Sequence, residues 1–164
     1  MTQSKKLIIV RHAHRNKLKG GEADNGLSAK GKKQAKALQK FYSSVFGRKK
    51  AIIFSSPKVR CIETVQPIAK KIKVSLETID SLDEAQVDSE LKEKIRSFHS
   101  LWQKLDSPLT LICSHGDWIP AFLKQMLGVE IDLDKGGWIE LELSEEKLKP
   151  RLTLRWIVQD PTLL

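Results

Sequence analysis

Residues 5–12, KKLIIVRH, and residues 109–115, LTLICSH, decide how this chain folds. In each stretch a short apolar run is flanked by polar residues, a pattern typical of a strand buried in a parallel sheet. Each run is closely followed by a histidine, His12 or His115. Ligands of open α/β sheets bind outside the carboxyl ends of the strands, where both histidines are expected. Arg11, beside His12, indicates a pocket for an anionic group.

Length and composition are those of an ordinary globular protein. The chain has 164 residues, of which 40% are hydrophobic and 30% charged, and we expect one domain over residues 1–164. The apolar run at residues 7–10 is too short for the core of a signal peptide or for a membrane span. The two cysteines, Cys61 and Cys113, have no metal-binding or redox spacing. We expect buried free thiols and a reducing, cytoplasmic setting.

The formal net charge of +9 allows two interpretations. Clustered Lys and Arg can neutralise the phosphates of a nucleic acid, or they can bias a surface toward anionic substrates and acidic protein partners. The lysines are spread over several predicted helical faces, and basic and aromatic residues do not interleave as they do in single-strand-binding proteins. The pattern therefore favours an anionic substrate or acidic partner over nucleic acid.

Strand and helix patterns alternate along the chain with short joints, which predicts an α/β fold with three α/β/α layers and a mostly parallel sheet. Near the end, residues 138–143 and 151–158 alternate apolar and polar side chains. This alternation indicates a half-exposed C-terminal β-hairpin, joined by a charged segment at 144–150. The other predicted elements are helices near 28–44, 57–69, 88–104 and 117–127, and strands near 51–54, 73–77 and 109–113.

Three loops that follow predicted strands carry the polar residues of interest. They are residues 11–15 (RHAHR), 55–60 (SSPKVR) and 114–117 (SHGD). If the strands are parallel neighbours, these loops meet at one rim and place two histidines and two arginines around one hollow. Guanidinium groups match phosphoryl oxygens and stay charged, and neutral imidazole is a competent nucleophile. These residue types fit phosphoryl transfer through a phosphohistidine intermediate.

Four segments of the sequence, in this order, resemble the signatures of the histidine phosphatase superfamily, which has the phosphoglycerate mutase-like fold. The resemblance implies that His12 is the phosphorylated nucleophile, with Arg11 and Arg60 gripping the phosphoryl group. It implies that His115 stabilises the charge of that group. The compact chain is most similar to the small phosphohistidine phosphatases of the SixA type. The segments are residues 11–13 (RHA), 27–35 (LSAKGKKQA), 55–64 (SSPKVRCIET) and 114–116 (SHG), which together span nearly the whole chain.

The same resemblance points to further site residues. Arg15 stands where the acid-phosphatase branch has a phosphate-binding arginine, so we include it among the phosphate ligands. The family often supplies a general acid from the irregular segment after the third strand, where Glu84 is the first candidate and Asp83 the second. Asp117 follows the second histidine too late to match the adjacent His-Asp pair of the acid-phosphatase branch. No role is assigned to His14.

Three alternatives stand beside a phosphatase. A zinc site could use His12, His14 and His115, but arginines would repel the metal ion. A non-catalytic module could bind phosphate or a phosphoprotein without a nucleophile. A mutase-type phosphotransferase would need substrate-capping insertions, for which the chain has no room.

Ser28 and Gly31 are expected to be architectural, as a helix cap and a tight packing contact.

We therefore expect a metal-independent phosphatase that acts on a phosphomonoester or on a phosphohistidine protein. The predicted partner is a phosphorylated small molecule or phosphoprotein, with phosphate or sulfate in the pocket. We expect neither a nucleic acid nor a membrane as partner, and no metal or organic cofactor, because cationic side chains replace the usual magnesium. The predicted catalytic residues are His12, His115, Arg11, Arg60 and Glu84, and the predicted phosphate-binding residues are Arg11, Arg15, Arg60 and His115.

Overall fold

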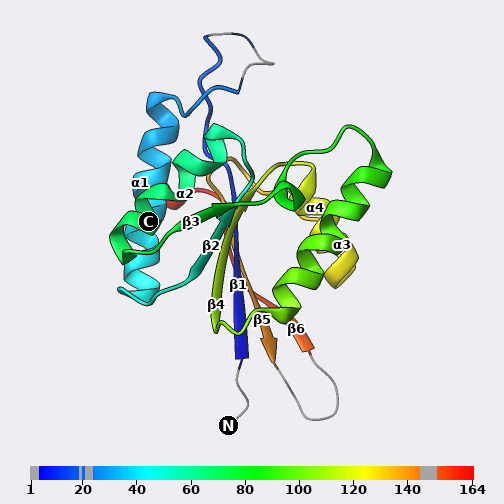
Figure 1. Ribbon diagram of the computed structural model, residues 1–164. Helices are drawn as coiled ribbons and strands as arrows, with labels where there is room; N and C mark the ends of the chain where they lie inside the picture. Colours follow the sequence, from blue (N-terminus) through cyan, green and yellow to red (C-terminus); the bar gives the residue numbers. More distant parts are fainter. Residues whose placement is uncertain (1–3, 19, 21–23, 145–150) are drawn as a thin grey trace.

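A computed structural model describes residues 4–18, 20, 24–144 and 151–164. The strands are β1 Ser4–Arg11, β2 Ile52–Ser55, β3 Leu76–Thr78, β4 Leu109–Ser114, β5 Trp138–Ser144 and β6 Arg151–Val158. They form one six-stranded sheet in the order β3-β2-β4-β1-β5-β6 (Figure 1). The first four strands in that order are parallel, β5 pairs antiparallel with β1, and β6 pairs antiparallel with β5. The mostly parallel sheet is as predicted.

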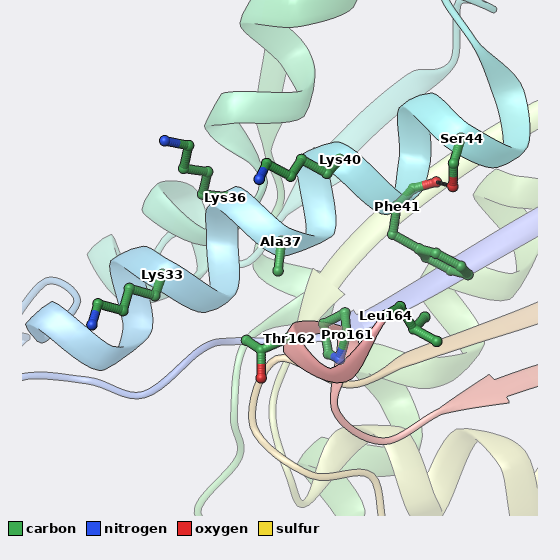
Figure 2. Close-up of a pocket in the computed structure, with 9 residues that line it drawn as sticks. All are labelled: Lys33, Lys36, Ala37, Lys40, Phe41, Ser44, Pro161, Thr162 and Leu164. Carbon is green, nitrogen blue, oxygen red and sulfur yellow. Dashed lines mark hydrogen bonds between the residues drawn. The ribbon is translucent and has the colours of Figure 1, made fainter.

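Helices cover both faces of this sheet (Figure 1). Because successive side chains of a strand point to opposite faces, Ile8 and Val10 of β1 pack with α1 and α2, whereas Leu7 and Ile9 pack with α3 and α4. The predicted three-layer α/β/α architecture is confirmed. The helices are α1 Ala29–Phe46, α2 Val59–Ile72, α3 Asp88–Lys104 and α4 Trp118–Leu127, with short 3₁₀ turns η1 Asp80–Leu82 and η2 Pro161–Leu163. The η2 turn packs beside α1 (Figure 2). None of the helices described is long and apolar enough to cross a membrane.

The predicted C-terminal hairpin is present, but its first strand is more buried than expected. Trp138, Ile139 and Leu141 have no exposed surface, because β5 pairs with β1 inside the sheet; of the two hairpin strands, β6 is the one at an edge. Glu140 is also buried, and it accepts a hydrogen bond from Lys6 at 2.6 Å. The joint predicted at 144–150 lies outside the described residues from position 145 onward.

Two predicted boundaries were wrong by a few residues. The strand expected at 73–77 is β3, Leu76–Thr78, because α2 continues to Ile72. Lys73 then closes the helix in the left-handed region, with φ of 55°. The second helix, expected to begin at Pro57, begins at Val59. Neither change moves the carboxyl ends of the strands that carry the candidate site.

The start of α1 fixes the loop that follows β1. Ser28 caps the helix, because its Oγ accepts a hydrogen bond from the Gly31 N–H at 3.1 Å. A Cβ atom on Gly31 would lie 2.0 Å from the carbonyl oxygen of His14. Glycine therefore allows the loop to lie directly on the helix. The predicted cap and packing contact are both confirmed.

Gly31→Ala should destabilise the protein, because the added methyl group must push the His14 carbonyl away from α1. We expect the free energy of unfolding to fall by about 1–3 kcal/mol, the range for overpacking. Lys32→Ala, at an exposed position of the same helix, should stay within about 0.5 kcal/mol of the wild type. Urea denaturation at neutral pH measures both, and equal midpoints for the two variants would contradict the proposed contact.

Candidate active site

The candidate site is built where neighbouring parallel strands end. Arg11, the last residue of β1, is the register partner of Ser114, the last residue of β4. The His12 N–H continues this pairing by donating to the Ser114 carbonyl at 3.0 Å. His12 and His115 consequently follow adjacent strands, and their ring centroids lie 5.4 Å apart. The third predicted loop, after β2, brings Arg60 to the same place, so the expected convergence is observed.

His12 carries a neutral ring whose orientation is fixed. The residue is 6% exposed, and its Nδ1 lies 2.9 Å from the carbonyl oxygen of Ala13. A carbonyl oxygen only accepts hydrogen bonds, so Nδ1 carries the proton and Nε2 keeps a free lone pair. Burial is the largest cause that lowers the pKa of His12 to about 3. The hydrogen bond to Ala13 opposes this shift, and the positive charges of His115, Arg60 and Arg11 add to it.

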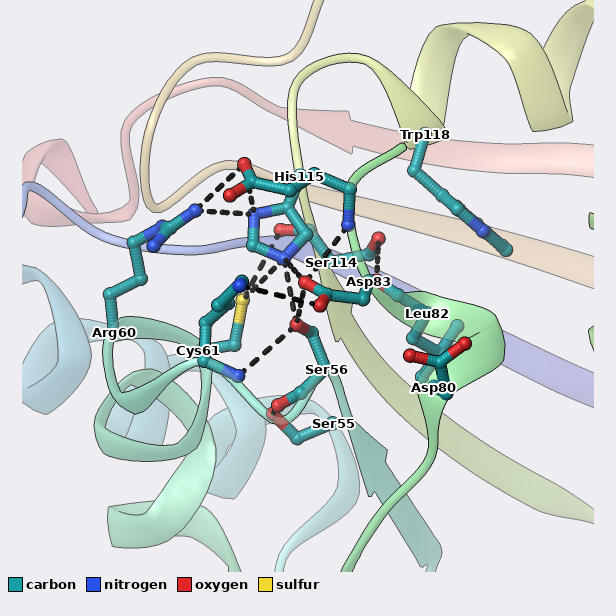
Figure 3. A network of polar contacts seen from close by, with 12 residues as sticks. Ser55, Ser56, Arg60, Cys61, Asp80, Leu82, Asp83, Ser114, His115 and Trp118 are labelled. Carbon is teal, nitrogen blue, oxygen red and sulfur yellow. Dashed lines mark hydrogen bonds and ion pairs between the residues drawn. The ribbon is translucent and has the colours of Figure 1, made fainter. Parts of the chain in front are cut away.

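His115 is buried between Arg60, whose Nη2 lies 3.2 Å from His115 Nδ1, and a group of polar side chains around Nε2 (Figure 3). The Ser56 hydroxyl donates to Asp83 Oδ1 at 2.9 Å, so it accepts from His115 Nε2 at 2.8 Å. Asp83 Oδ1 also lies 3.2 Å from this nitrogen, and Cys61 Sγ lies 3.6 Å from it. Burial lowers the pKa of His115, and so does Arg60. The interactions with Asp83 and Cys61 outweigh both and raise the pKa to about 9.

The two rings therefore differ in charge at neutral pH. His12 is neutral and has an unprotonated Nε2, which makes it able to attack an electrophile. His115 is a cation, which makes it able to stabilise negative charge on a bound group. Environments that push the pKa values of two like groups apart are typical of catalytic pairs with divided roles.

Arg60 is a buried cation with two carboxylate partners. Its side chain is 4% exposed; Nη2 donates to Glu84 Oε2 at 2.8 Å, and Nη1 lies 3.8 Å from Asp24 Oδ1. The same Glu84 oxygen lies 3.7 Å from His115 Nδ1. Burial raises the pKa of Glu84, but Arg60 and His115 lower it overall, so the carboxyl is ionised at neutral pH. A carboxylate oxygen thus already accepts a hydrogen bond from Arg60 and lies near His115, as a phosphoryl oxygen could.

Arg11 packs against the loop that carries the second histidine. Its Nη1 donates to the Leu133 carbonyl at 2.6 Å. The guanidinium lies against Gly116, where a Cβ atom would come within 2.5 Å of Nη2. Its Nε is buried and has no hydrogen-bond partner among the described residues. Gly116 therefore leaves room for the guanidinium of Arg11 in this position.

The remaining residues of the first loop are placed differently. The side chain of Arg15 makes no hydrogen bond or ion pair with the described part of the chain, and its backbone forms a bridge with Leu27. His14 Nδ1 donates to Ser28 Oγ at 2.8 Å, since that hydroxyl donates its own proton to the His14 carbonyl. His14 thus ties the loop to α1. In the described residues, no group of three His, Cys, Asp or Glu side chains is arranged to hold a metal ion.

The three candidates for the general acid have separate environments. Asp83 is bound to Ser56 and His115. Burial raises its pKa, but these hydrogen bonds outweigh burial and hold the pKa well below its usual range. Asp117 Oδ2 accepts the backbone N–H of Ala85 at 3.1 Å and so steadies the segment that carries Glu84. Glu84 alone combines contact with Arg60 and a half-exposed carboxyl.

The sequence did not single out Ser56 or Lys135 as site residues. It suggested Asp83 as a general acid and not as a partner of His115. Ser56 was placed in the correct loop, but nothing in its pattern showed that it would bind His115. Lys135 also lies in this region: burial lowers its pKa, and so do the charges of Lys17, Arg11, Arg15 and Arg60. A lysine in an irregular segment has no sequence signal that separates it from a surface lysine.

A family model described as histidine phosphatase superfamily (branch 1) matches residues 7–108 of the chain. No curated protein matches the sequence.

Several solved structures have a similar fold. A phosphoserine phosphatase from Entamoeba histolytica, in complex with 3-phosphoglyceric acid, is 19% identical with a TM-score of 0.74, covering 98% of this chain and 100% of that one. A mycobacterial glucosyl-3-phosphoglycerate phosphatase with inorganic phosphate is 16% identical, with a TM-score of 0.73 and coverage of 96% and 99%. The protein histidine phosphatase SixA, complexed with tungstate, is 14% identical, with a TM-score of 0.74 and coverage of 95% and 97%. At these identities the likeness shows the fold.

Asp83→Asn should lower the pKa of His115, because it removes the negative charge beside Nε2 while keeping the shape of the side chain. In the wild type we expect the His115 ring to titrate near pH 9, and in the variant at clearly lower pH. Asp80→Asn, which changes an exposed carboxylate on η1, serves as the control and should leave the midpoint unchanged. NMR titration of the imidazole resonances measures the shift. A His115 midpoint that Asp83→Asn does not move would contradict this role of Asp83.

Proposed function

The chain belongs to the histidine phosphatase superfamily, and we propose that it is a phosphatase that acts through a phosphohistidine at His12. The observation that most supports this proposal is the placement of the His12 and His115 rings, with centroids 5.4 Å apart, in surroundings that lower the pKa of His12 and raise that of His115. The neutral ring supplies the nucleophile. The charged ring supplies a hydrogen-bond donor to the phosphoryl group.

In the first step, His12 Nε2 attacks phosphorus, and the bond from phosphorus to the leaving group breaks. The hydrogen bond from Nδ1 to Ala13 keeps the reactive nitrogen in a fixed orientation. Arg11, Arg60 and His115 neutralise the charge on the equatorial oxygens. These cations supply the charge stabilisation that a metal ion gives in other phosphoryl-transfer sites. We therefore propose a reaction without metal or organic cofactor.

Glu84 acts as the acid when the leaving group needs a proton. In the unliganded site, Arg60 and His115 hold its pKa below the usual value. A bound phosphoryl group takes over both cations and places negative charge next to the carboxyl, and both effects raise the pKa. The protonated Glu84 can then protonate an alkoxide. In the second step water attacks phosphorus, Glu84 accepts its proton, and the P–N electron pair returns to Nε2 as inorganic phosphate leaves.

Arg15 remains a proposed phosphate ligand. Its charge, with those of Arg11 and Arg60, contributes to the lowered pKa of Lys135, which supports a position close to the other phosphate-binding arginines.

The substrate is proposed to be a phosphomonoester or a phosphohistidine protein. The Glu84 side chain is 42% exposed, so water has access to the group that must activate it. This access favours hydrolysis over a mutase-type transfer, in which the intermediate is shielded. Cys61 and Cys113 are both buried and neither is in a disulfide, which supports a reducing, cytoplasmic location.

Replacing His12 with alanine should abolish turnover while leaving the anion site. We expect hydrolysis of p-nitrophenyl phosphate to fall at least about 10³-fold, because the step through the covalent intermediate is lost. Tungstate binding, measured by calorimetry, should persist because the cations remain. His99→Ala on α3 is the matched control and should retain activity. Full activity in His12→Ala would disprove the nucleophile. A wild type that binds tungstate but hydrolyses neither small phosphoesters nor a phosphohistidine protein would favour the binding-module alternative.

Glu84→Gln should separate substrates by their need for a proton. With an alkyl phosphomonoester, kcat/KM should fall about 10²-fold or more, the usual contribution of a general acid. With a phosphohistidine protein, whose labile P–N bond needs less acid help, the loss should stay below about tenfold. Steady-state assays of phosphate release measure both. Glu90→Gln, an exposed carboxylate on α3 that also pairs with a lysine, is the control. Equal losses on the two substrates would contradict the acid role of Glu84.

A further inference from the structure

Two cavities lie along α1, and one of them is at the rim of the candidate site. At the rim, a cavity of about 390 Å³ lies between the start of α1, at Lys30, and the segment 159–160, and it is also lined by Arg11. Farther along the helix, a cavity of about 430 Å³ lies between α1 and Pro161, Thr162 and Leu164 (Figure 2). In both cavities α1 forms one side and part of the segment 159–164 forms another, and residues 14, 134 and 135 also line the cavity at the rim. We call them together the α1 groove.

One wall of the α1 groove carries a row of lysines. Lys33, Lys36 and Lys40 follow one another at intervals of three and four residues, which places them along one side of the helix. All three are exposed, and none belongs to an ion pair among the described residues. Like charges at this spacing repel each other and weaken a helix, so an anionic occupant would relieve the repulsion.

The floor of the α1 groove is apolar. Figure 2 shows Ala37 directed toward Pro161, and the ring of Phe41 beside Leu164, while the lysine side chains extend outward. Leu164 as a whole residue is 77% exposed, so an occupant can cover it. An occupant therefore needs acidic groups for the wall and apolar groups for the floor.

We propose that the α1 groove binds an acidic segment of a protein substrate, with apolar side chains between its carboxylates. From Lys30 to Lys40 the helix rises about 15 Å, at about 1.5 Å per residue, which matches about five extended residues of a partner chain. The rim end of the groove opens at Arg11, where the phosphorylated side chain would enter. The identity of the occupant as a substrate rests on the proposed function; its acidic and apolar character rests on the groove alone.

A nucleic acid fits the same groove less well. Its rim end carries mixed charge, because Asp134 and Asp160 lie there together with Arg11, Lys30 and Lys135. A phosphodiester backbone is anionic throughout, so it would meet the two carboxylates with unfavourable charge. The Phe41 ring packs edge-on against Trp138, with centroids 5.1 Å apart and an interplanar angle of 81°, so it is not free to stack on a base. A protein segment can place neutral or basic residues opposite the two carboxylates.

The test measures binding of an unphosphorylated fluorescent peptide of alternating Glu and Leu, by fluorescence anisotropy. The groove variant is Lys33→Glu, Lys36→Glu and Lys40→Glu combined. The control variant, Arg48→Glu, Lys50→Glu and Lys71→Glu combined, makes the same change of net charge at exposed positions outside the groove. We expect the Kd to rise at least about tenfold in the groove variant and much less in the control. Turnover of p-nitrophenyl phosphate should match the wild type in both variants.

A second variant tests the apolar floor and does not depend on the stability of the triple substitution. Leu164→Ser should weaken binding of the Glu-Leu peptide but not of a peptide of alternating Glu and Ser. Equal weakening of the Glu-Leu peptide by the groove and control variants would show that net charge alone drives binding and would overturn the proposal. Tighter binding of a single-stranded oligonucleotide of equal charge would overturn it as well. Because the probe carries no phosphate, this result stands apart from any failure of the phosphatase assays.

Discussion

The in-register parallel pairing of β1 with β4 is the constraint on which the candidate site depends. It sets Arg11 opposite Ser114, and the next residues along the two strands bring the histidine rings together. A slip of one residue would turn every side chain of β1 to the opposite face of the sheet. The slip is opposed by Leu7 and Ile9 in one core and by Ile8 and Val10 in the other. The apolar pattern that buries the strand therefore also fixes the distance between the two rings.

The carboxylates of the site are distributed unevenly, and this distribution decides the charge of each ring. Burying Arg60 and His115 is costly unless each cation has a partner, and Asp83, Glu84 and Asp24 provide those partners. Within the described residues, no carboxylate contacts the ring of His12, whose one hydrogen bond is to a backbone carbonyl. Two similar side chains that follow adjacent strands thus acquire different protonation states from their neighbours, one neutral and one positive. In the proposed reaction this difference exists before the substrate arrives, so little reorganisation is needed.

The sequence predicted what depends on local pattern, and it failed where the outcome depends on which elements become neighbours. The apolar runs that end just before Arg11 and Ser114 predicted the position of the candidate site at the rim of the sheet. The motif around Arg60 predicted that a third loop would reach the same rim. The alternating pattern of residues 138–143 could not reveal that β5 lies inside the sheet, because that follows from its pairing with β1. The contact between Asp83 and His115 joins residues far apart in the chain, and no periodicity relates them. The closeness of Gly116 to Arg11 is likewise visible only after the loops are assembled.

The position of Glu84 has a consequence for the end of the proposed catalytic cycle. Its Oε2 contacts Arg60 and lies near His115 in the absence of a ligand. Every anion that binds must therefore displace the Glu84 carboxylate from these cations. Affinity for the substrate is reduced by the strength of that contact. The departing product is affected in the same way, because the carboxylate returns to the cations as inorganic phosphate leaves. Without it, a site this rich in positive charge would retain inorganic phosphate. The Glu84 carboxylate competes with the product for the cations and so limits product inhibition.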